Sequence, residues 1–360
     1  MKKVLIIINT GFVSFGGLAT VMMNYYSHME LDGLIIDFAS NNEPDYKILQ
    51  ELRNGSKYYN LGARNRIFSY TLNLYNLIKE KEYDVVHVNG NSATMLLELG
   101  VAKILGVRKR IAHVHASKSG HPILHSILSP FFKEMYTDAI AVSKMAGDWL
   151  YGDNYIVLNN AIDTYKYAYN EDIRNRLRKE LNCNEEFVIG NIGKLTDMKN
   201  QTFLLDIFAE YIKINKHSKL LIGGGGDLEN ELVDKAKHLG IQNEVVFLGM
   251  LSNVEEILQV FDCFLFTSKY EGLGMVLIEA QASGLMCLSS SSVPKETKVT
   301  NNIEYIDLEA PIAQWIKQIE LIRKRKLDRS VLSKDARASI RRNGYYINDQ
   351  VDALRDIYLE

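Results

Sequence analysis

A glycine-containing turn between two glutamates is the stretch of this sequence best suited to chemistry. Glu271 opens the run EGLGMVLIE and Glu279 closes it, with Gly272 and Gly274 between them. The apolar run 264–266 before it predicts a buried strand, and the apolar residues after it recur at helical spacing. A helix that begins here offers free N–H groups to a phosphate, and glycines let a ligand approach the backbone. With carboxylates for hydroxyl groups, the stretch could hold a sugar nucleotide.

Two lysines follow another predicted strand, residues 187–192. Lys194 stands in the run GKL directly after it, and Lys199 precedes a predicted helix over 202–215. If a nucleoside diphosphate were the leaving group, its developing charge would have to be neutralised, and two lysines at a strand end could do so. Two solvated lysines are the alternative interpretation.

Further glycines stand where predicted strands end. The run LLIGGGG, with Gly224 inside it, leads into a predicted helix, and Gly16-Gly17 follows the predicted strand Lys2–Ile8. Because the first loop lacks the pattern GxGxxG, a dinucleotide fingerprint is not supported. A tight turn that needs glycine for backbone reasons is the alternative at Gly16 and Gly17.

One histidine lies at the carboxyl end of a predicted strand, residues 110–115. Alternation puts His113 and His115 on the same side of this strand. Open α/β sheets bind ligands at the carboxyl ends of their strands, so we expect His115 to take part in a donor site. His87, inside the predicted strand 83–89, is interpreted as structural.

Length and composition indicate a globular α/β protein. The chain has 360 residues, which favours two domains, and its formal net charge of -2 implies no general attraction to nucleic acid. Three cysteines lack metal-binding spacing and are expected to be buried in a reducing compartment, the cytoplasm. The apolar run at the start is too short for a signal peptide, and none is long enough to cross a bilayer. Alternating strands and helical segments predict doubly wound parallel sheets.

The run EGLGMVLIEAQASG resembles the signature of the retaining GT-B glycosyltransferases of family 4, the glycosyl transferases group 1. The run GKL followed by Lys199, the GG loop and the run NNAID at 159–163 resemble further pieces of that family in the expected order. Three positions depart from the family pattern. Ala161 replaces a glycine, Lys194 stands where arginine is commoner, and Ala116 follows His115.

The resemblance implies an α/β protein of GT-B fold, with two Rossmann-like domains whose parallel sheets face a cleft. Residues 1–163, completed by 345–360, would form the acceptor-side domain, and 164–344 the nucleotide-sugar domain. Glu271 would bind sugar hydroxyls and Glu279 ribose hydroxyls, while Lys194 and Lys199 would hold the diphosphate in place of a metal. The other residues expected at the nucleotide sugar are Gly16, Gly17, Gly193, Gly224, Met250, Gly272, Gly274 and Met275.

The implied reaction is retaining transfer of a sugar from a UDP-sugar, which is a substrate and not a cofactor, to an acceptor hydroxyl. The acceptor would be a lipid-linked glycan in bacterial capsule or other surface polysaccharide synthesis. A hydrolysing nucleotide-sugar epimerase of the same fold and a catalytically silent binding partner are the alternatives. Incubation with the donor alone separates the first, since an epimer would form, and detectable transfer excludes the second.

The segment Lys118 to Lys133 combines basic and apolar residues. Such a helix could bind anionic lipid at the inner face of the cell membrane. The alternative is a helix that packs on the core and exposes one side to solvent. The apolar positions are Ile123, Leu124, Ile127, Leu128, Phe131 and Phe132.

Overall fold

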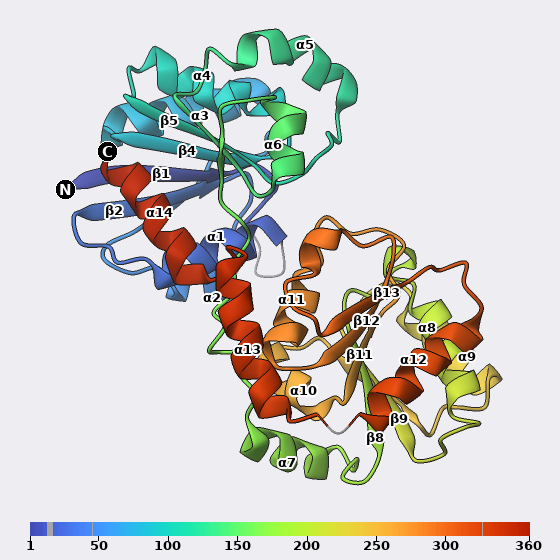
Figure 1. Cartoon of the computed structure of the whole chain (residues 1–360). Coiled ribbons are helices and arrows are strands. Elements are labelled where there is room, and N and C mark those ends of the chain that lie inside the picture. The colour runs from blue at the N-terminus through green and yellow to red at the C-terminus, as the bar shows by residue number, and fades with distance from the viewer. Residues whose placement is uncertain (13–16, 45, 326) are drawn as a thin grey trace. The chain divides into compact units, whose positions relative to one another are not determined.

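The computed structural model describes residues 1–12, 17–44, 46–325 and 327–360, and it divides into two compact units (Figure 1). The first unit comprises Met1–Ile162 together with Gly344–Glu360, and the second comprises Asp163–Asn343. No helix among the residues described is long and apolar enough to cross a membrane.

The first unit is built on a parallel sheet in the order β3-β2-β1-β4-β5-β6-β7. Its strands are β1 (Lys2–Ile8), β2 (Leu34–Ser40), β3 (Tyr58–Asn60), β4 (Val85–Gly90), β5 (Lys109–Val114), β6 (Asp138–Ala141) and β7 (Ile156–Val157). The chain order reverses between β1 and β4, so the loops that follow these two strands leave in opposite directions. Open α/β sheets bind their ligands at such a point.

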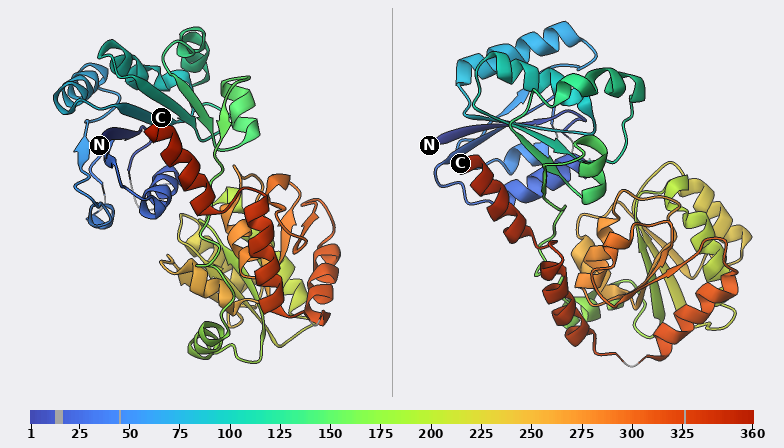
Figure 2. Two further views of the ribbon diagram at one scale, coloured as in Figure 1. Left: turned by 60° about the vertical axis from the view of Figure 1, so that its left-hand side comes forward. Right: turned by 45° about the horizontal axis from the view of Figure 1, so that its top comes forward.

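Helices cover both faces of this sheet (Figures 1 and 2). They are α1 (Gly17–His28), α2 (Tyr46–Gln50), α3 (Ile67–Lys81), the 3-10 turn η1 (Ala93–Met95), α4 (Leu96–Ile104), α5 (Pro122–Phe132), α6 (Lys144–Leu150) and α14 (Ile347–Leu359). Strand alternation decides which side chain faces which helix. Val4 and Ile6 join the core under α1 and α14, whereas Leu5 and Ile7 join the core under α3 and α4. The C-terminal helix α14 therefore completes the first unit, and Lys2 Nζ donates to the carbonyl of Leu359 at 2.5 Å.

The second unit repeats this plan with a parallel sheet in the order β10-β9-β8-β11-β12-β13. Its strands are β8 (Phe187–Ile192), β9 (Ser218–Gly223), β10 (Val245–Gly249), β11 (Cys263–Phe266), β12 (Met286–Ser290) and β13 (Ile303–Ile306). Its helices are α7 (Glu171–Glu180), α8 (Gln201–Tyr211), α9 (Glu229–His238), α10 (Val254–Val260), α11 (Met275–Ala282), α12 (Ile312–Lys324) and α13 (Arg329–Arg342), with the 3-10 turns η2 (Asp197–Lys199) and η3 (Lys295–Thr297). Here the order reverses between β8 and β11.

The prediction of an α/β protein with two Rossmann-like domains on parallel sheets is confirmed, and three local predictions change. His115 lies one residue beyond the end of β5 and not inside the strand. The edge strand β13 was not predicted. The helix expected within 117–133 begins only at Pro122, a residue suited to the first turn because it needs no backbone N–H there. The three cysteines are buried and free, as expected.

Candidate active site

Two loops at the switch point of the second unit are bonded to each other. Residues 193–200 follow β8 and residues 267–274 follow β11. The backbone N–H of Lys269 donates to the carbonyl of Met198 at 2.8 Å, and Thr267 Oγ1 donates to the carbonyl of Asn200 at 3.0 Å. The loops that carry Lys199 and Glu271 are therefore held side by side by one backbone hydrogen bond and one bond from a threonine side chain.

Lys199 and Glu271 form an ion pair across these loops. Nζ of Lys199 lies 2.5 Å from Oε1 of Glu271, and the side chains are 23% and 9% exposed. The ammonium group also stands over the ring of Phe266, 5.3 Å from its centroid, and the lysine stem passes beside Gly193. An anion that reached this place would find a cation whose side chain is already held in position.

Glycines let the loop after β9 pack its backbone directly against the backbone of the loop after β8. A Cβ on Gly224, whose φ is +127°, would lie 2.1 Å from the carbonyl oxygen of Gly193. The N–H of Gly193 in turn donates to the carbonyl of Gly223 at 2.9 Å. Met250, 60% exposed, lies beside the same loop, since its sulfur would be 2.9 Å from a Cβ on Gly225.

The helix α11 begins at Met275, four residues after Glu271. Gly274 precedes the helix in the left-handed conformation with φ 87°, which glycine adopts at little cost, and no side chain caps the helix. Met275 is the first helical residue, and the space around Gly272 is open. The first amides of α11 are thus available to an anion beside the Lys199–Glu271 pair.

Glu279 lies on α11, four residues after its first residue, Met275. Burial raises the pKa of Glu279 to about 7, and a hydrogen bond from Tyr167 acts in the opposite direction. Tyr167 was not predicted as a site residue, because nothing in the sequence around it indicates a partner for a distant glutamate. Lys194, by contrast, is exposed, and its carbonyl accepts a hydrogen bond from Gln201 Nε2 at 3.2 Å.

The first unit presents uncharged groups beside its own switch point, at the carboxyl ends of β4 and β5. Nε2 of His115 lies 2.9 Å from Oδ1 of Asn89, the partly exposed histidine following β5 and the buried asparagine lying near the end of β4. Burial lowers the pKa of His115 below its usual value. Gly17 begins α1, and no atom of the described residues lies within 4 Å of a Cβ placed on it, while Gly16 lies outside the described residues. Asn89 was also missed, although its place at the end of a predicted strand was a usable signal.

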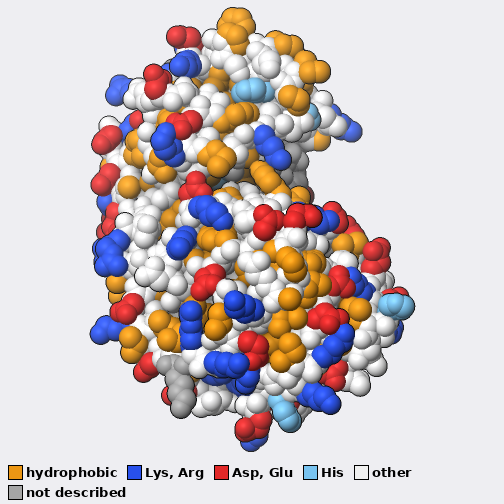
Figure 3. Space-filling view, turned by 45° about the vertical axis from the view of Figure 1, so that its right-hand side comes forward, with side chains coloured by type: hydrophobic (Ala, Val, Ile, Leu, Met, Phe, Trp, Pro, Cys, Tyr) orange, Lys and Arg blue, Asp and Glu red, His pale blue; other side chains and the backbone are white. Residues whose placement is uncertain are grey.

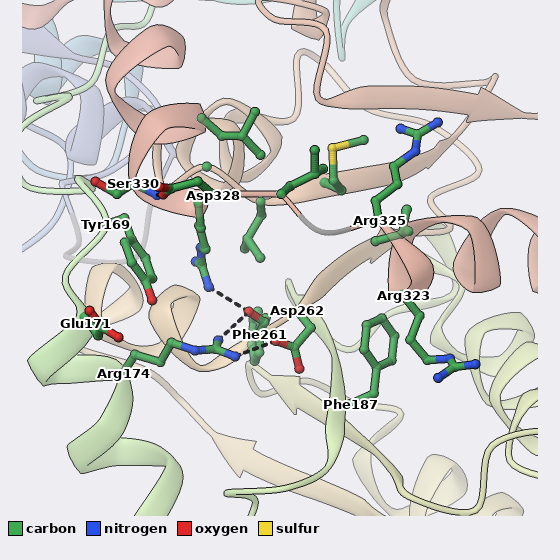
Figure 4. Close-up of a pocket in the computed structure, with 17 residues that line it drawn as sticks. Tyr169, Glu171, Arg174, Phe187, Phe261, Asp262, Arg323, Arg325, Asp328 and Ser330 are labelled. Carbon is green, nitrogen blue, oxygen red and sulfur yellow. Dashed lines mark hydrogen bonds and ion pairs between the residues drawn. The ribbon is translucent and has the colours of Figure 1, made fainter.

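A pocket of about 620 Å³ lies at the amino ends of the strands of the second sheet, opposite to the site described above, and none of the predicted site residues lines it (Figure 4). It is lined by residues at the amino ends of β8, β11 and β12 and by the segment between α12 and α13. Its arginines are engaged with the protein itself. Arg174 reaches Asp262 at 2.5 Å, and Arg329 donates to backbone carbonyls at the ends of α10 and α11. We therefore interpret this pocket as the edge of a structural charge cluster.

The helix α5 exposes most of its apolar side chains. Ile123, Ile127 and Phe131 are 78%, 61% and 62% exposed, while Phe132 is 2% exposed and belongs to the core. The interpretation of α5 as a core-packing helix is therefore wrong for most of it, and the inclusion of Phe132 in an outer apolar face is wrong too. Figure 3 shows hydrophobic side chains on the surface of the first unit in its upper part.

Comparison with known proteins finds glycosyltransferases that are similar to this chain in sequence, and solved structures that are similar to it in fold. The family model described as glycosyl transferases group 1 matches residues 172–339. The putative glycosyltransferase EpsF of Bacillus subtilis (strain 168) is 28% identical over 364 residues, covering 95% of this chain and 93% of that protein. An Escherichia coli UDP-Gal:alpha-D-GlcNAc-diphosphoundecaprenol alpha-1,3-galactosyltransferase is 25% identical, with 80% of this chain and 78% of that protein covered. The crystal structure of Anabaena HepE in complex with UDP and glucose matches with a TM-score of 0.79 and 16% identity, covering 99% of this chain and 100% of that one.

Proposed function

We propose that this chain, a group 1 glycosyltransferase of GT-B fold, transfers a sugar from a UDP-sugar to a hydroxyl of a lipid-linked glycan, with retention at the anomeric carbon and without a metal ion. The observation that carries the proposal is the Lys199–Glu271 pair beside the uncapped start of α11. It combines a fixed cation, free amides and a carboxylate, which are the groups that a sugar diphosphate needs. The UDP-bound complex of HepE and the UDP-Gal named for the E. coli relative support the choice of nucleotide.

Each site residue has a role in this proposal. Lys199, Lys194 and the amides after Gly274 stabilise the diphosphate as the bond to the sugar breaks. Glu271 accepts hydrogen bonds from sugar hydroxyls once its lysine turns to the phosphate, and Glu279 accepts them from the ribose. Gly193, Gly224, Gly272, Met275 and Met250 shape the space around the nucleotide.

Retention follows from departure and attack on one face of the sugar. Glu271 pairs with Lys199 in this structure and is assigned to sugar hydroxyls when the donor binds, so the proposal gives it no role as the nucleophile of a covalent intermediate. The acceptor oxygen forms the new bond as the bond to the diphosphate breaks. The acceptor proton passes to the departing phosphate oxygen, so charge and atoms balance.

The direct test is an assay of the purified chain with a panel of UDP-sugars and a polyprenyl diphosphate-linked sugar as acceptor. We expect a product one sugar longer, whose new linkage keeps the anomeric configuration of the donor by NMR. A product of inverted configuration would contradict retention. An epimer formed from the donor alone would support an epimerase, and nucleotide binding without any turnover would support a silent partner.

The lipid-linked acceptor is supported by the apolar face of α5 and by the diphosphoundecaprenol in the name of the E. coli relative. Lys133, 65% exposed, stands just after this face, so a peripheral contact with anionic lipid combines apolar and electrostatic terms. In this proposal the protein works at the cytoplasmic face of the membrane.

A vesicle assay tests this contact with a matched pair of variants. Ile127 on α5 and Ile214 after α8 are both 61% exposed, so each can be replaced by serine at equal cost to the core. We expect Ile127→Ser to lower co-sedimentation with vesicles containing acidic lipid several-fold, and Ile214→Ser to leave it unchanged. Equal binding by both variants, or equal binding to neutral and acidic vesicles, would favour a soluble acceptor.

A further inference from the structure

A row of buried polar side chains runs through the core of the first unit from its C-terminal helix. The hydroxyl of Tyr358 on α14 lies 2.6 Å from Nδ1 of His87 on β4, and Nε2 of His87 lies 3.2 Å from Nδ1 of His113 on β5. All three side chains are at most 1% exposed. Burial lowers the pKa of both histidines, so each ring carries a single N–H.

Counting hydrogens allows two directions for this row. If Tyr358 donates, His87 Nε2–H donates to His113, and the proton of His113 lies on Nε2, which has no hydrogen-bond partner among the described residues. If His113 donates, Nδ1–H of His87 donates to the hydroxyl of Tyr358, whose own proton then has no acceptor among the described residues. Each direction leaves one buried donor unmatched, and in each the protons of the three groups are coupled and point the same way along the row.

His113, the last residue of the row, packs beside the hydrogen-bonded pair of His115 and Asn89. His113 is the register partner of Asn89 on the neighbouring strand, and its ring centroid is 4.2 Å from that of His115. Asn89 presents Oδ1 to Nε2 of His115 at 2.9 Å, while its buried Nδ2 has no partner in the part of the chain that the structure describes. The ring of His115 is thus fixed by a packed imidazole on one side and by an amide oxygen on the other.

We propose that Asn89 and the row Tyr358–His87–His113 are positioning residues for His115, which they hold in one orientation with its proton on Nε2, so that Nδ1 accepts a hydrogen bond from a ligand hydroxyl. The Nε2–H is committed to Asn89, and Nδ1 makes no hydrogen bond to the described residues. A neutral acceptor nitrogen repels phosphate oxygens and attracts O–H groups. Resting on the proposed function, this inference assigns His115 to a hydroxyl of the sugar or the acceptor and not to the diphosphate.

Nitrogen NMR of histidine-labelled, ligand-free protein reads the tautomers directly, with each ring assigned through a His→Gln variant. We expect His115 to be protonated on Nε2 in the wild type. Asn89→Leu removes the acceptor and should leave His115 as a mixture of tautomers. A wild-type His115 protonated on Nδ1, or a spectrum of His115 that Asn89→Leu does not change, would overturn the proposal.

Tyr358→Phe and Tyr25→Phe form a matched pair for the row. Both tyrosines are buried in the same hydrophobic cluster, but the hydroxyl of Tyr25 donates to the carbonyl of Asn159, outside the row. We expect only Tyr358→Phe to shift the nitrogen signals of His87 and His113, with similar losses of thermal stability in both variants. Identical histidine spectra in the two variants would refute the row.

The functional arm is the transfer assay. Asn89→Leu is expected to lower turnover about tenfold, the order expected for one lost hydrogen bond, with Tyr25→Phe within about twofold of the wild type. If transfer is not detected at all, the proposed function fails while the NMR result still decides the tautomer. If transfer is detected and Asn89→Leu is as active as Tyr25→Phe, the positioning role fails alone.

Discussion

The sheets of the two units share a strand order, apart from the additional edge strand β7, but the carboxyl ends of their central strands carry different chemistry. At the switch point of the second unit, Lys199 and Glu271 are charged and paired at 2.5 Å. Beside the switch point of the first unit, at the carboxyl ends of β4 and β5, Asn89, His113 and His115 are uncharged, because burial lowers the pKa of the histidines. A parallel sheet therefore fixes where a ligand binds, whereas the side chains at the strand ends determine which ligand it is.

This contrast fits the division of labour that we propose. A diphosphate needs cations and amides, which the second unit offers, while hydroxyl groups need neutral acceptors and donors, which the first unit offers. The predictions below concern the charged residues of the second unit and run from the largest expected effect to the smallest.

Replacing Arg329 should have the largest effect. Its guanidinium donates to the carbonyls of Leu258, Phe261 and Ser283, and so it joins the ends of α10 and α11. Arg329→Met leaves these buried carbonyls unpaired and should lower the free energy of unfolding of the second unit by about 3–5 kcal/mol. Arg323→Met is the control, because Arg323 is 37% exposed and, among the described residues, forms its ion pair within its own helix, with Glu320. Equal denaturation midpoints for the two variants would contradict a structural role for Arg329.

Lys199→Ala should lower turnover by about two to three orders of magnitude, because removing a preorganised charge from a developing anion typically costs that much. Lys269→Ala is the matched control, since Lys269 belongs to the adjoining loop and pairs with Asp197 at the surface. We expect this control to stay within about twofold of the wild type. Similar activity in both variants would show that Lys199 does not meet the diphosphate.

The pH dependence of nucleotide binding should report on Glu279. Its folded pKa is raised by burial to about 7, so the carboxyl is largely protonated at pH 6 and ionised at pH 8. An ionised carboxylate accepts two ribose hydrogen bonds, so UDP affinity should rise on the order of tenfold between these pH values. Glu279→Gln should bind more weakly at pH 8 and lose this rise, which calorimetry can measure. Because Tyr167 lowers the pKa, Tyr167→Phe should move the rise to higher pH.

The same group makes a signed prediction for stability. Between the unfolded value near 4.5 and the folded value near 7, the native state binds more protons than the unfolded state. Stability should therefore fall as pH rises through this window and then remain constant. Glu279→Gln should remove this decline, and an identical decline in wild type and variant would assign it to other groups.

Sequence patterns predicted the sheets and the loops of the second site because both depend on local signals. Apolar runs ended by glycine mark buried parallel strands, and Glu271 and Lys199 stand in the loops that follow two of them. The edge strand β13 was missed, since it has only four residues, IEYI, too few to show a clear period. The orientation of Phe131 and Phe132 depends on where α5 begins, and adjacent residues of a helix face different ways.

Partners distant in sequence could not be predicted. Tyr167 and Glu279, or Tyr358 and His87, are neighbours only because the helices and strands that carry them pack together. Patterns in one segment hold no information about such contacts. The same holds for the 2.5 Å distance between Lys199 and Glu271, although both residues were singled out beforehand.

The smallest expected effect is that of a chelator, which tests whether the lysines and amides of the second unit take the place of a metal ion. If Lys199, Lys194 and the amides of α11 neutralise the diphosphate, a divalent ion at the same phosphates would add little to the field already there. We therefore expect turnover in excess EDTA to stay within about twofold of turnover in magnesium. In Lys199→Ala, added magnesium should partly restore activity, because the position of the missing charge is then open to a cation. Wild-type activity that is abolished by EDTA and returns with magnesium or manganese would show that the lysines do not replace a metal, and the second site would then need a different electrostatic account.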